Sequence, residues 1–471
     1  MPNIIAYLML MVWPVVCVML FKRLKLERAI VWSILGGYLV MPPKTSLDLP
    51  LVPDFDKTSI PSLCALGFCI MIAKRRVPLW PRSPTARVLL ILFMLGTIPT
   101  VLTNTDPIFF QSLFDTQPVT FITGVLPGLR WIDMLSVLSS QAIILIPFVL
   151  GRAFLANATG QRELLLALVI GGVIYSVPAM FEVRMSPQLN IWIYGFFQHD
   201  FGQMIRQGGF RPIVFLIHAL WIAFFFMTAL VAAAALTRDA DRTLRPRFIA
   251  STVYLFAVLY FCKSLAPLLY GLSLVPVVLF LAPRMQVRIA LGFAAIAVTY
   301  PILRDYNLVP LDTLVGWANA IDPLRAESLA YRFENEEQLL TRAHDKWLFG
   351  WGGWGRNLVR DLQTGDIVNI PDGEWIIVFG TFGWVGYLSK MGLLAAPLFL
   401  LWRGMRGAAP TVAIAALALI LAITLVDMLI NAILTPYTWM IAGAILGHYE
   451  NTQPDRHARR EKTRGTRPLI S

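Results

Sequence analysis

Charged residues are scarce in this chain of 471 residues: Asp, Glu, Lys and Arg make up only 14% of it, whereas 57% is hydrophobic. A soluble globular domain usually contains about 25% charged residues. A soluble enzyme of this length would therefore lack polar groups for its surface, and a disordered chain would contain far fewer apolar residues. The composition excludes both classes and predicts an all-α polytopic membrane protein.

Cysteine is scarce as well, and its positions exclude two further classes of protein. The four cysteines are Cys17, Cys64, Cys69 and Cys262, and all of them lie in apolar runs. A disulfide framework or a cysteine-based metal site is therefore not expected, and the thiols are predicted to be buried and inert. No carboxylate pair has the spacing of metal ligands, so we also expect neither a metal nor a cofactor.

Apolar runs bounded by charge or proline predict about 11–13 transmembrane helices. The first run begins at the N-terminus without a basic leader, so it is interpreted as a span and not as a cleaved signal. Two runs, at 29–41 and 60–73, are shorter than the ~20 residues that a helix needs to cross. The runs lie at 3–21, 29–41, 60–73, 88–103, 131–151, 163–181, 212–236, 248–262, 264–282, 289–303, 375–402, 409–429 and 437–448.

Basic residues predict the orientation. Segment 22–28 and every second connection after it hold 25 of the 40 Lys and Arg residues, although these segments are short. Such segments face the cytoplasm, which places the C-terminus there and explains the net charge of +12 by contact with a lipid bilayer. Nucleic-acid binding is not expected, because no basic segment is accompanied by aromatic residues that stack on bases.

The other side carries the long connections. The predicted organisation is a transmembrane bundle at 1–303 with outer loops at 104–130 and 182–211, followed by a large outer loop at 304–374. Helical periodicity in this last loop predicts amphipathic helices on or near the membrane face. The remaining parts are C-terminal transmembrane helices at 375–448 and a disordered basic tail at 449–471.

Two arginines in the second outer loop are candidates for binding a phosphate group. Arg206 and Arg211 flank Gly208-Gly209, just before a predicted span. The guanidinium fork matches phosphate oxygens, and glycines allow a close backbone approach, so the pair suits a lipid-linked diphosphate. The alternative is that both charges anchor a helix end at the lipid headgroups.

The large loop supplies further candidates. Arg325, Arg332 and Glu336 fall on one face of a helix, which is either a substrate-binding face or a salt-bridged surface. The stretch that contains Trp351 and Trp354 has too many glycines for a regular helix. These tryptophans are either interfacial anchors or a wall of a glycan site.

Two carboxylates, Asp372 and Glu374, stand at the mouth of the next span. Either is a candidate general base for a hydroxyl group, and Asp372 is also placed to cap the helix. Gly380, Gly383 and Gly386 follow at three-residue spacing, which predicts close packing against another helix.

Three ionisable residues lie within predicted spans: Lys263, Lys390 and Asp427. Charge inside a bilayer is costly, so such residues are functional candidates, although pairing or an interfacial position explains each of them as well. Lys263 is predicted to mark a tight turn between two spans, and Asn431 follows Asp427 closely.

The order of these features resembles the O-antigen ligase and O-antigen polymerase superfamily over roughly residues 190–400. The resemblance rests on the Arg-Gly stretch that enters a span, on Tyr331-Arg332-Phe333 before the glycine turn Leu348–Gly352, and on a polar residue opening the Gly380–Gly386 helix. The chain departs from the family at one point: the family often has a His-Asn pair where this chain has Asp372-Gly373-Glu374. Either carboxylate replaces the histidine, or the acceptor differs, or catalysis is lost.

The resemblance implies a GT-C-like glycosyltransferase of the bacterial inner membrane with a periplasmic active site. The donor would be a glycan on undecaprenyl pyrophosphate, and the acceptor another glycan or lipid A-core; partners can include other polysaccharide assembly proteins. Arg206, Arg211 and Arg332, with Arg325, would bind the diphosphate, and Asp372 or Glu374 would activate the acceptor. A multi-span transporter or flippase for a lipid-linked or polar substrate is the alternative, favoured by glycine and proline within spans.

Overall fold

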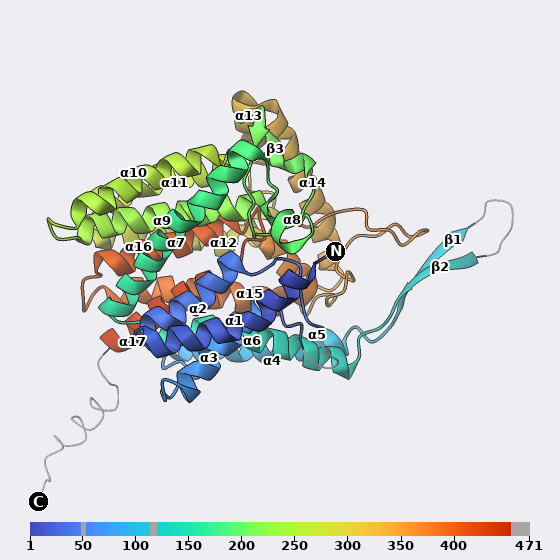
Figure 1. The fold of residues 1–471 in the computed structure, drawn as a ribbon. Helices are drawn as coiled ribbons and strands as arrows, with labels where there is room; N and C mark the ends of the chain where they lie inside the picture. Colours follow the sequence, from blue (N-terminus) through green and yellow to red (C-terminus); the bar gives the residue numbers. More distant parts are fainter. Residues whose placement is uncertain (49–52, 114–119, 454–471) are drawn as a thin grey trace, which may run out of the picture.

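The computed structural model of the protein describes residues 1–48, 53–113 and 120–453, without the side chains of residues 112, 113, 120, 121 and 325. Helices dominate this part of the chain, and Figure 1 shows them as one elongated bundle. The predicted all-α class is confirmed in this coarse sense. The tail predicted at 449–471 starts within a helix that ends at Thr452, and residues 454–471 lie outside the described residues.

The first half of the chain contains both long and short helices. Its helices are α1 (Ile4–Arg23), α2 (Leu26–Val40), α3 (Ser59–Met71), α4 (Pro84–Leu95), α5 (Thr97–Leu102), α6 (Trp131–Phe154), α7 (Ala158–Met185), α8 (Leu189–Tyr194) and α9 (Ala219–Asp239). The short apolar runs predicted at 29–41 and 60–73 correspond to α2 and α3, of 15 and 13 residues.

The second half continues the bundle and adds two helices at one end of it. Its helices are α10 (Arg245–Phe261), α11 (Leu265–Phe280), α12 (Pro283–Asp305), α13 (Leu311–Ile321), α14 (Pro323–His344), α15 (Glu374–Gly404), α16 (Val412–Asp427) and α17 (Pro436–Thr452). The predicted helices of the large loop are thus present as α13 and α14. Residues 283–288, predicted as a connection, belong to α12 instead.

Within the described residues, seven helices are long and apolar enough to cross a membrane: α1, α4 with α5, α6, α7, α9, α12 and α15. Shorter apolar helices, including α3, α11 and α16, complete the bundle. The prediction of 11–13 spans is therefore larger than the number of full-length helices, because several of the apolar runs fold into helices of fewer than 18 residues. Exposed apolar side chains such as Leu8, Met11 and Val15 on α1 are those expected of a lipid-facing surface.

The core is centred on α9, which contacts α7, α10, α11 and α16 and is almost completely buried. Its run of alanines and phenylalanines brings neighbouring backbones close together: a Cβ added at Gly172 of α7 would lie 2.7 Å from Cβ of Ala229. Small residues allow such approach between membrane helices. The four cysteines are free thiols, three of them buried, as predicted.

The connections between the long helices lie at two opposite ends of the bundle (Figure 1). The predicted outer segments gather at one end, where Asn3 donates its backbone N–H to the Tyr194 carbonyl (2.9 Å). This end lies to the right in Figure 1 and also carries α14. The predicted cytoplasmic segments meet at the other end, where Arg152 pairs with Glu450 (3.1 Å).

Two small sheets interrupt the helices. The outer loop predicted at 104–130 contains an antiparallel hairpin, β1 (Ile108–Leu113) with β2 (Thr120–Leu126), which projects from the bundle in Figure 1. The second is a minimal hairpin, β3 (Ile205–Arg206) with β4 (Gly209–Phe210), next to the short 3-10 turn Gly202–Met204. The turn of this second hairpin lies between the two arginines singled out in the sequence.

Candidate functional site

The β3–β4 hairpin contains Arg206, and we call it the Arg206 hairpin. It owes its shape to its two turn residues. Gln207 and Gly208 both have positive φ (51° and 65°), which is the type I′ turn that matches the twist of a two-residue hairpin. Gly209 allows a close approach, because a Cβ there would lie 2.4 Å from the Lys263 ammonium. That ammonium donates to the Arg206 carbonyl (3.1 Å), so the turn between α10 and α11 holds the hairpin in place.

The segment after the hairpin is fixed by a buried carboxylate that sequence reasoning did not identify. Glu182, near the end of α7, accepts backbone N–H groups of Leu189, Ile213 and Val214 at 2.7–3.1 Å. Arg211 precedes these last two residues, is 3% exposed, and donates to the Ser264 hydroxyl (2.8 Å). Arg211 is thus built into the protein, whereas Arg206 is half-buried.

Arg332 of α14 joins the start of α15 to the connection between α16 and α17. Its Nε lies 3.5 Å from Oδ2 of Asp372, and its Nη1 donates to Oδ1 of Asn431 (3.1 Å). Asn431 in turn donates to Oδ1 of the buried Asp427 (3.1 Å). Arg332 and Asp372 keep 25% and 36% of their side chains exposed, so both remain accessible to a ligand.

The two predicted carboxylates have different environments. Burial raises the pKa of Asp372, and the positive charge of Arg332 acts in the opposite direction. Glu374 is the first residue of α15, and its backbone N–H donates to the Met428 carbonyl (2.9 Å). Its carboxylate forms an ion pair with Lys390, which lies further along the same helix. Asp372 is therefore the carboxylate that faces the half-exposed arginine, and Glu374 is committed to Lys390.

Glu336, predicted on the same helix face as Arg332, anchors α14 to the bundle. Its carboxylate accepts from Tyr300 (3.0 Å), Arg304 (2.9 Å) and the Trp375 indole (3.0 Å). Burial raises the pKa of Glu336 in spite of these donors. Arg325 belongs to α14 as well, but its side chain lies outside the described part of the structure.

Arginines from the second outer loop and from α14 both affect the pKa of one histidine, His218. His218 caps α9 through its Nδ1, which accepts the Leu220 N–H (2.9 Å), and its ring packs edge-on against His199 at 4.5 Å. Burial and then the positive charges of Arg211, His199, Arg332 and Arg206 lower the pKa of His218 to about 3. Arg206, Arg211 and Arg332 thus all lie near enough to His218 to disfavour a further positive charge there, and we call them the arginine group.

The glycine-tryptophan stretch fills a break in α15. Gly383 has a non-helical backbone (φ 62°, ψ −161°), and the freed backbone groups bond to the loop: Trp351 N–H to the Gly380 carbonyl (2.9 Å) and Trp384 N–H to the Trp347 carbonyl (2.8 Å). Gly380, Gly383 and Gly386 therefore do not pack against another helix. A Cβ on Gly383 would lie 2.4 Å from the Leu348 backbone, and one on Gly386 would meet Phe382 of its own helix.

The two tryptophans of this stretch differ in exposure. The Trp351 ring lies under the Arg342 guanidinium at 3.5 Å and the Lys346 ammonium at 4.7 Å, and its indole N–H donates to the Arg342 carbonyl (2.7 Å). Trp354 is 56% exposed and has a positive φ. Trp351 thus belongs to the packing of the break, while Trp354 is on the surface.

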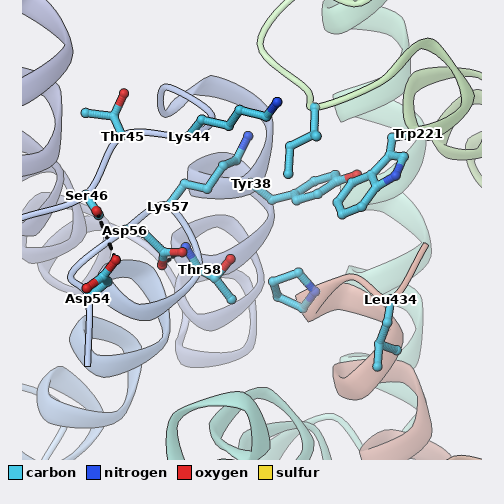
Figure 2. A pocket seen from close by; sticks show the side chains of 12 residues that line it. Tyr38, Lys44, Thr45, Ser46, Asp54, Asp56, Lys57, Thr58, Trp221 and Leu434 are labelled. Carbon is cyan, nitrogen blue, oxygen red and sulfur yellow. Dashed lines mark hydrogen bonds between the residues drawn. The ribbon is translucent and has the colours of Figure 1, made fainter. Parts of the chain in front are cut away.

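A pocket of about 310 Å³ opens beside the arginine group, and sequence reasoning did not identify it. The connection between α2 and α3 supplies most of its lining, and the residues before α9 and α17 supply the rest. Figure 2 shows Lys44 and Lys57 on one side of it, above Tyr38 and Trp221. The sequence contains one indication of this pocket: the connection at 42–58, between two short apolar runs, combines Lys and Asp with prolines.

No protein-family model and no curated protein sequence matches this chain. Within the residues that the structure describes, no three or more His, Cys, Asp or Glu side chains are grouped so as to hold a metal ion. The chemistry of the site therefore has to be inferred from its own arginines, lysines and carboxylates.

Proposed function

We propose that the protein is a glycosyltransferase of surface polysaccharide assembly, which transfers a glycan from undecaprenyl pyrophosphate to a sugar hydroxyl at the periplasmic face of the bacterial inner membrane. The observation that carries this proposal is that Arg332 pairs with the partly exposed Asp372, while the charges of the whole arginine group lower the pKa of one histidine, His218. The proposed reaction has an anionic leaving group, which cations stabilise, and a hydroxyl nucleophile, which a carboxylate can deprotonate.

In the proposed reaction the acceptor hydroxyl oxygen attacks the anomeric carbon of the donor sugar. The bond between that carbon and the diphosphate oxygen breaks, and the lipid diphosphate leaves with the electron pair. Arg332 and Arg206, which are half-buried, bind the diphosphate oxygens, and the buried Arg211 adds positive potential.

Asp372 takes the proton of the acceptor hydroxyl. Its raised pKa makes it a better base than a fully solvated aspartate would be, and Arg332 keeps it oriented at 3.5 Å. Glu374, held by Lys390, positions the start of α15. The acceptor is a second lipid-linked glycan in a polymerase or lipid A-core in a ligase.

A transporter or flippase is the second candidate, and one observation bears on it. The break of α15 at Gly383 is a discontinuity of the kind that binds substrates in transporters. Here the freed backbone groups bond to residues 347–352 of the chain itself, which leaves them unavailable to a substrate. This favours the transferase.

The test is transfer by the purified protein in lipid nanodiscs, supplied with a lipid-diphosphate glycan and an acceptor glycan. Arg332→Ala and Asp372→Asn should each lower the rate by about 100-fold or more, as loss of a group that stabilises developing charge typically does. Arg184→Ala, an exposed arginine at the end of α7, is the matched control and should transfer normally. Unchanged transfer by Arg332→Ala and Asp372→Asn would remove the proposed roles, and lipid flipping without transfer would favour the transporter.

A further inference from the structure

The pocket beside the arginine group has no part in the proposed transfer step, yet it is built for a ligand. Its volume of about 310 Å³ falls at the lower end of the ~300–1,000 Å³ typical of small-molecule sites. Tyr38 and Trp221 form one wall, with their rings stacked at 6.4 Å and 22°. An aromatic wall of this kind offers a flat apolar face to the C–H groups of a sugar ring.

Lys57 lies at the inner end of the pocket. It is 7% exposed, its ammonium donates to the Phe215 carbonyl at 2.8 Å, and it lies 5.4 Å above the Tyr38 ring. An ammonium group has three N–H donors, so one carbonyl does not satisfy it. Burial lowers the pKa of Lys57 to about 7, with Asp56 acting weakly in the opposite direction. An anionic ligand would recover the cost of burying this cation.

Tyr38 gives a second, independent indication of a ligand. Its side chain is 3% exposed and lines the pocket, and its hydroxyl has no hydrogen-bond partner among the described residues. A buried hydroxyl without a partner costs free energy. A ligand oxygen that approaches over the aromatic wall would provide the partner.

Lys44 and two carboxylates complete the polar lining. Lys44 is exposed, has a left-handed backbone (φ 51°), and its charge contributes to the lowered pKa of His199. Figure 2 shows its side chain above that of Lys57, with Asp54 and Asp56 below Lys57, on the side away from Trp221. Asp56 caps α3 by accepting two backbone N–H groups at 2.8 Å, and Asp54 accepts from Ser46 (3.1 Å).

We propose that this pocket binds an acidic monosaccharide, a sugar ring that carries one carboxylate, with Lys57 and Lys44 holding the carboxylate and Tyr38 and Trp221 holding the ring. The ammonium groups of Lys44 and Lys57 can donate to the two oxygens of one carboxylate, and the aspartates can accept sugar hydroxyls. A diphosphate carries more charge and fits the arginine group better. That the sugar belongs to the transferred glycan rests on the proposed function; the binding itself does not.

The experiment measures binding to the intact protein in nanodiscs by saturation-transfer NMR and isothermal titration, with glucuronate, glucose and inorganic phosphate as probes. Glucuronate should bind about tenfold or more tightly than glucose, because the charged hydrogen bonds are absent from the neutral sugar. Lys44→Met and Tyr38→Phe should each weaken glucuronate binding about tenfold, and Lys57→Met should weaken it most. Lys263→Met, a lysine at the same end that contacts the Arg206 hairpin, should leave it unchanged.

Equal binding of glucose and glucuronate, or binding of phosphate as tight as that of glucuronate, would overturn the proposal, since it would show a neutral-sugar site or a simple anion site. Unchanged glucuronate binding in Lys44→Met and Tyr38→Phe would overturn it too, even if Lys57→Met failed to fold. The two proposals fail separately: glucuronate binding without any glycan transfer would contradict only the proposed function, and transfer that needs Arg332 without glucuronate binding would contradict only the acidic-sugar site.

Discussion

Nε of Arg332 lies 3.5 Å from Oδ2 of Asp372, and this pair joins α14 to the residues just before α15, although the two are forty positions apart in the sequence. Both side chains remain partly exposed, whereas Asn431 and Asp427 behind them are buried. Buried polar side chains thus hold the accessible pair in place. Such an arrangement holds reactive groups in position before a substrate arrives.

The pH dependence of transfer should report the Asp372 carboxyl. Because a base acts in its ionised form, the rate should fall as pH drops through the pKa of Asp372, and burial places that pKa above the ordinary value. Arg332 lowers the pKa, so the residual activity of Arg332→Ala should fall off at a higher pH than that of the wild type. Profiles of kcat/KM against pH test this; an unchanged acid limb in the variant would contradict the pairing.

The break of α15 should depend on the absence of a side chain at Gly383. Its φ and ψ are almost exclusive to glycine, and a Cβ would lie 2.4 Å from the Leu348 backbone. Gly383→Ala should therefore destabilise the protein by roughly 3 kcal/mol or more. Gly353→Ala, in the docked loop but with no atom within 4 Å of the added Cβ, is the control. Thermal unfolding in detergent compares them, and equal midpoints would rule out the tight contact.

The buried carboxylate of Glu336 should contribute more to stability than its exposed neighbour. Glu336→Ala leaves Arg304 buried without its buried partner and removes acceptors for Tyr300 and Trp375, so a loss of about 3 kcal/mol is expected. Glu337 also contacts Arg304, at 2.6 Å, but its side chain is 57% exposed, and Glu337→Ala should cost less than about 1 kcal/mol. Urea or thermal unfolding in detergent measures both, and similar losses would show that α14 is not anchored through Glu336.

Lys57 should make stability depend on pH in alkaline solution. Its pKa is lowered from 10.5 to about 7 in the folded protein, so between these values the unfolded chain binds more protons. The free energy of unfolding contributed by Lys57 therefore rises as pH increases from about 7 towards 10.5. Lys57→Met should remove this rise and Lys44→Met should retain it. A wild-type curve with the same slope as that of Lys57→Met would show that folding does not lower the pKa of Lys57.

The sequence allowed prediction of what depends on composition and periodicity. Apolar runs indicated the helical membrane bundle, and the spacing of Leu311 and Leu324 with their successors indicated α13 and α14, because one amphipathic face repeats every 3.6 residues. The same reasoning did not give the helix lengths, since apolarity alone does not set them, and seven of the described helices are long and apolar enough to cross a membrane. It also missed the β1–β2 hairpin, although β2, Thr120–Leu126, is rich in aromatic and β-branched residues.

The site depends on contacts between distant segments, which periodicity does not report. Arg332 and Asp372 were identified as candidates, but their pairing is set by the connection after α16, where Asn431 holds Arg332. Pairing was one of the explanations for Lys390, but the sequence did not indicate its partner, which is Glu374 on the same helix, before the interruption at Gly383. Lys57 and Tyr38 were not singled out, because only the fold places them in one pocket.

The central claim is that the arginine group binds one diphosphate beside Asp372, and electron cryo-microscopy of the protein in nanodiscs with undecaprenyl pyrophosphate tests it most directly. The account predicts diphosphate density within about 3 Å of the guanidinium groups of both Arg206 and Arg332, with the prenyl chain leading into the lipid. Density elsewhere, for example against Lys44 and Lys57 with neither arginine in contact, would contradict it.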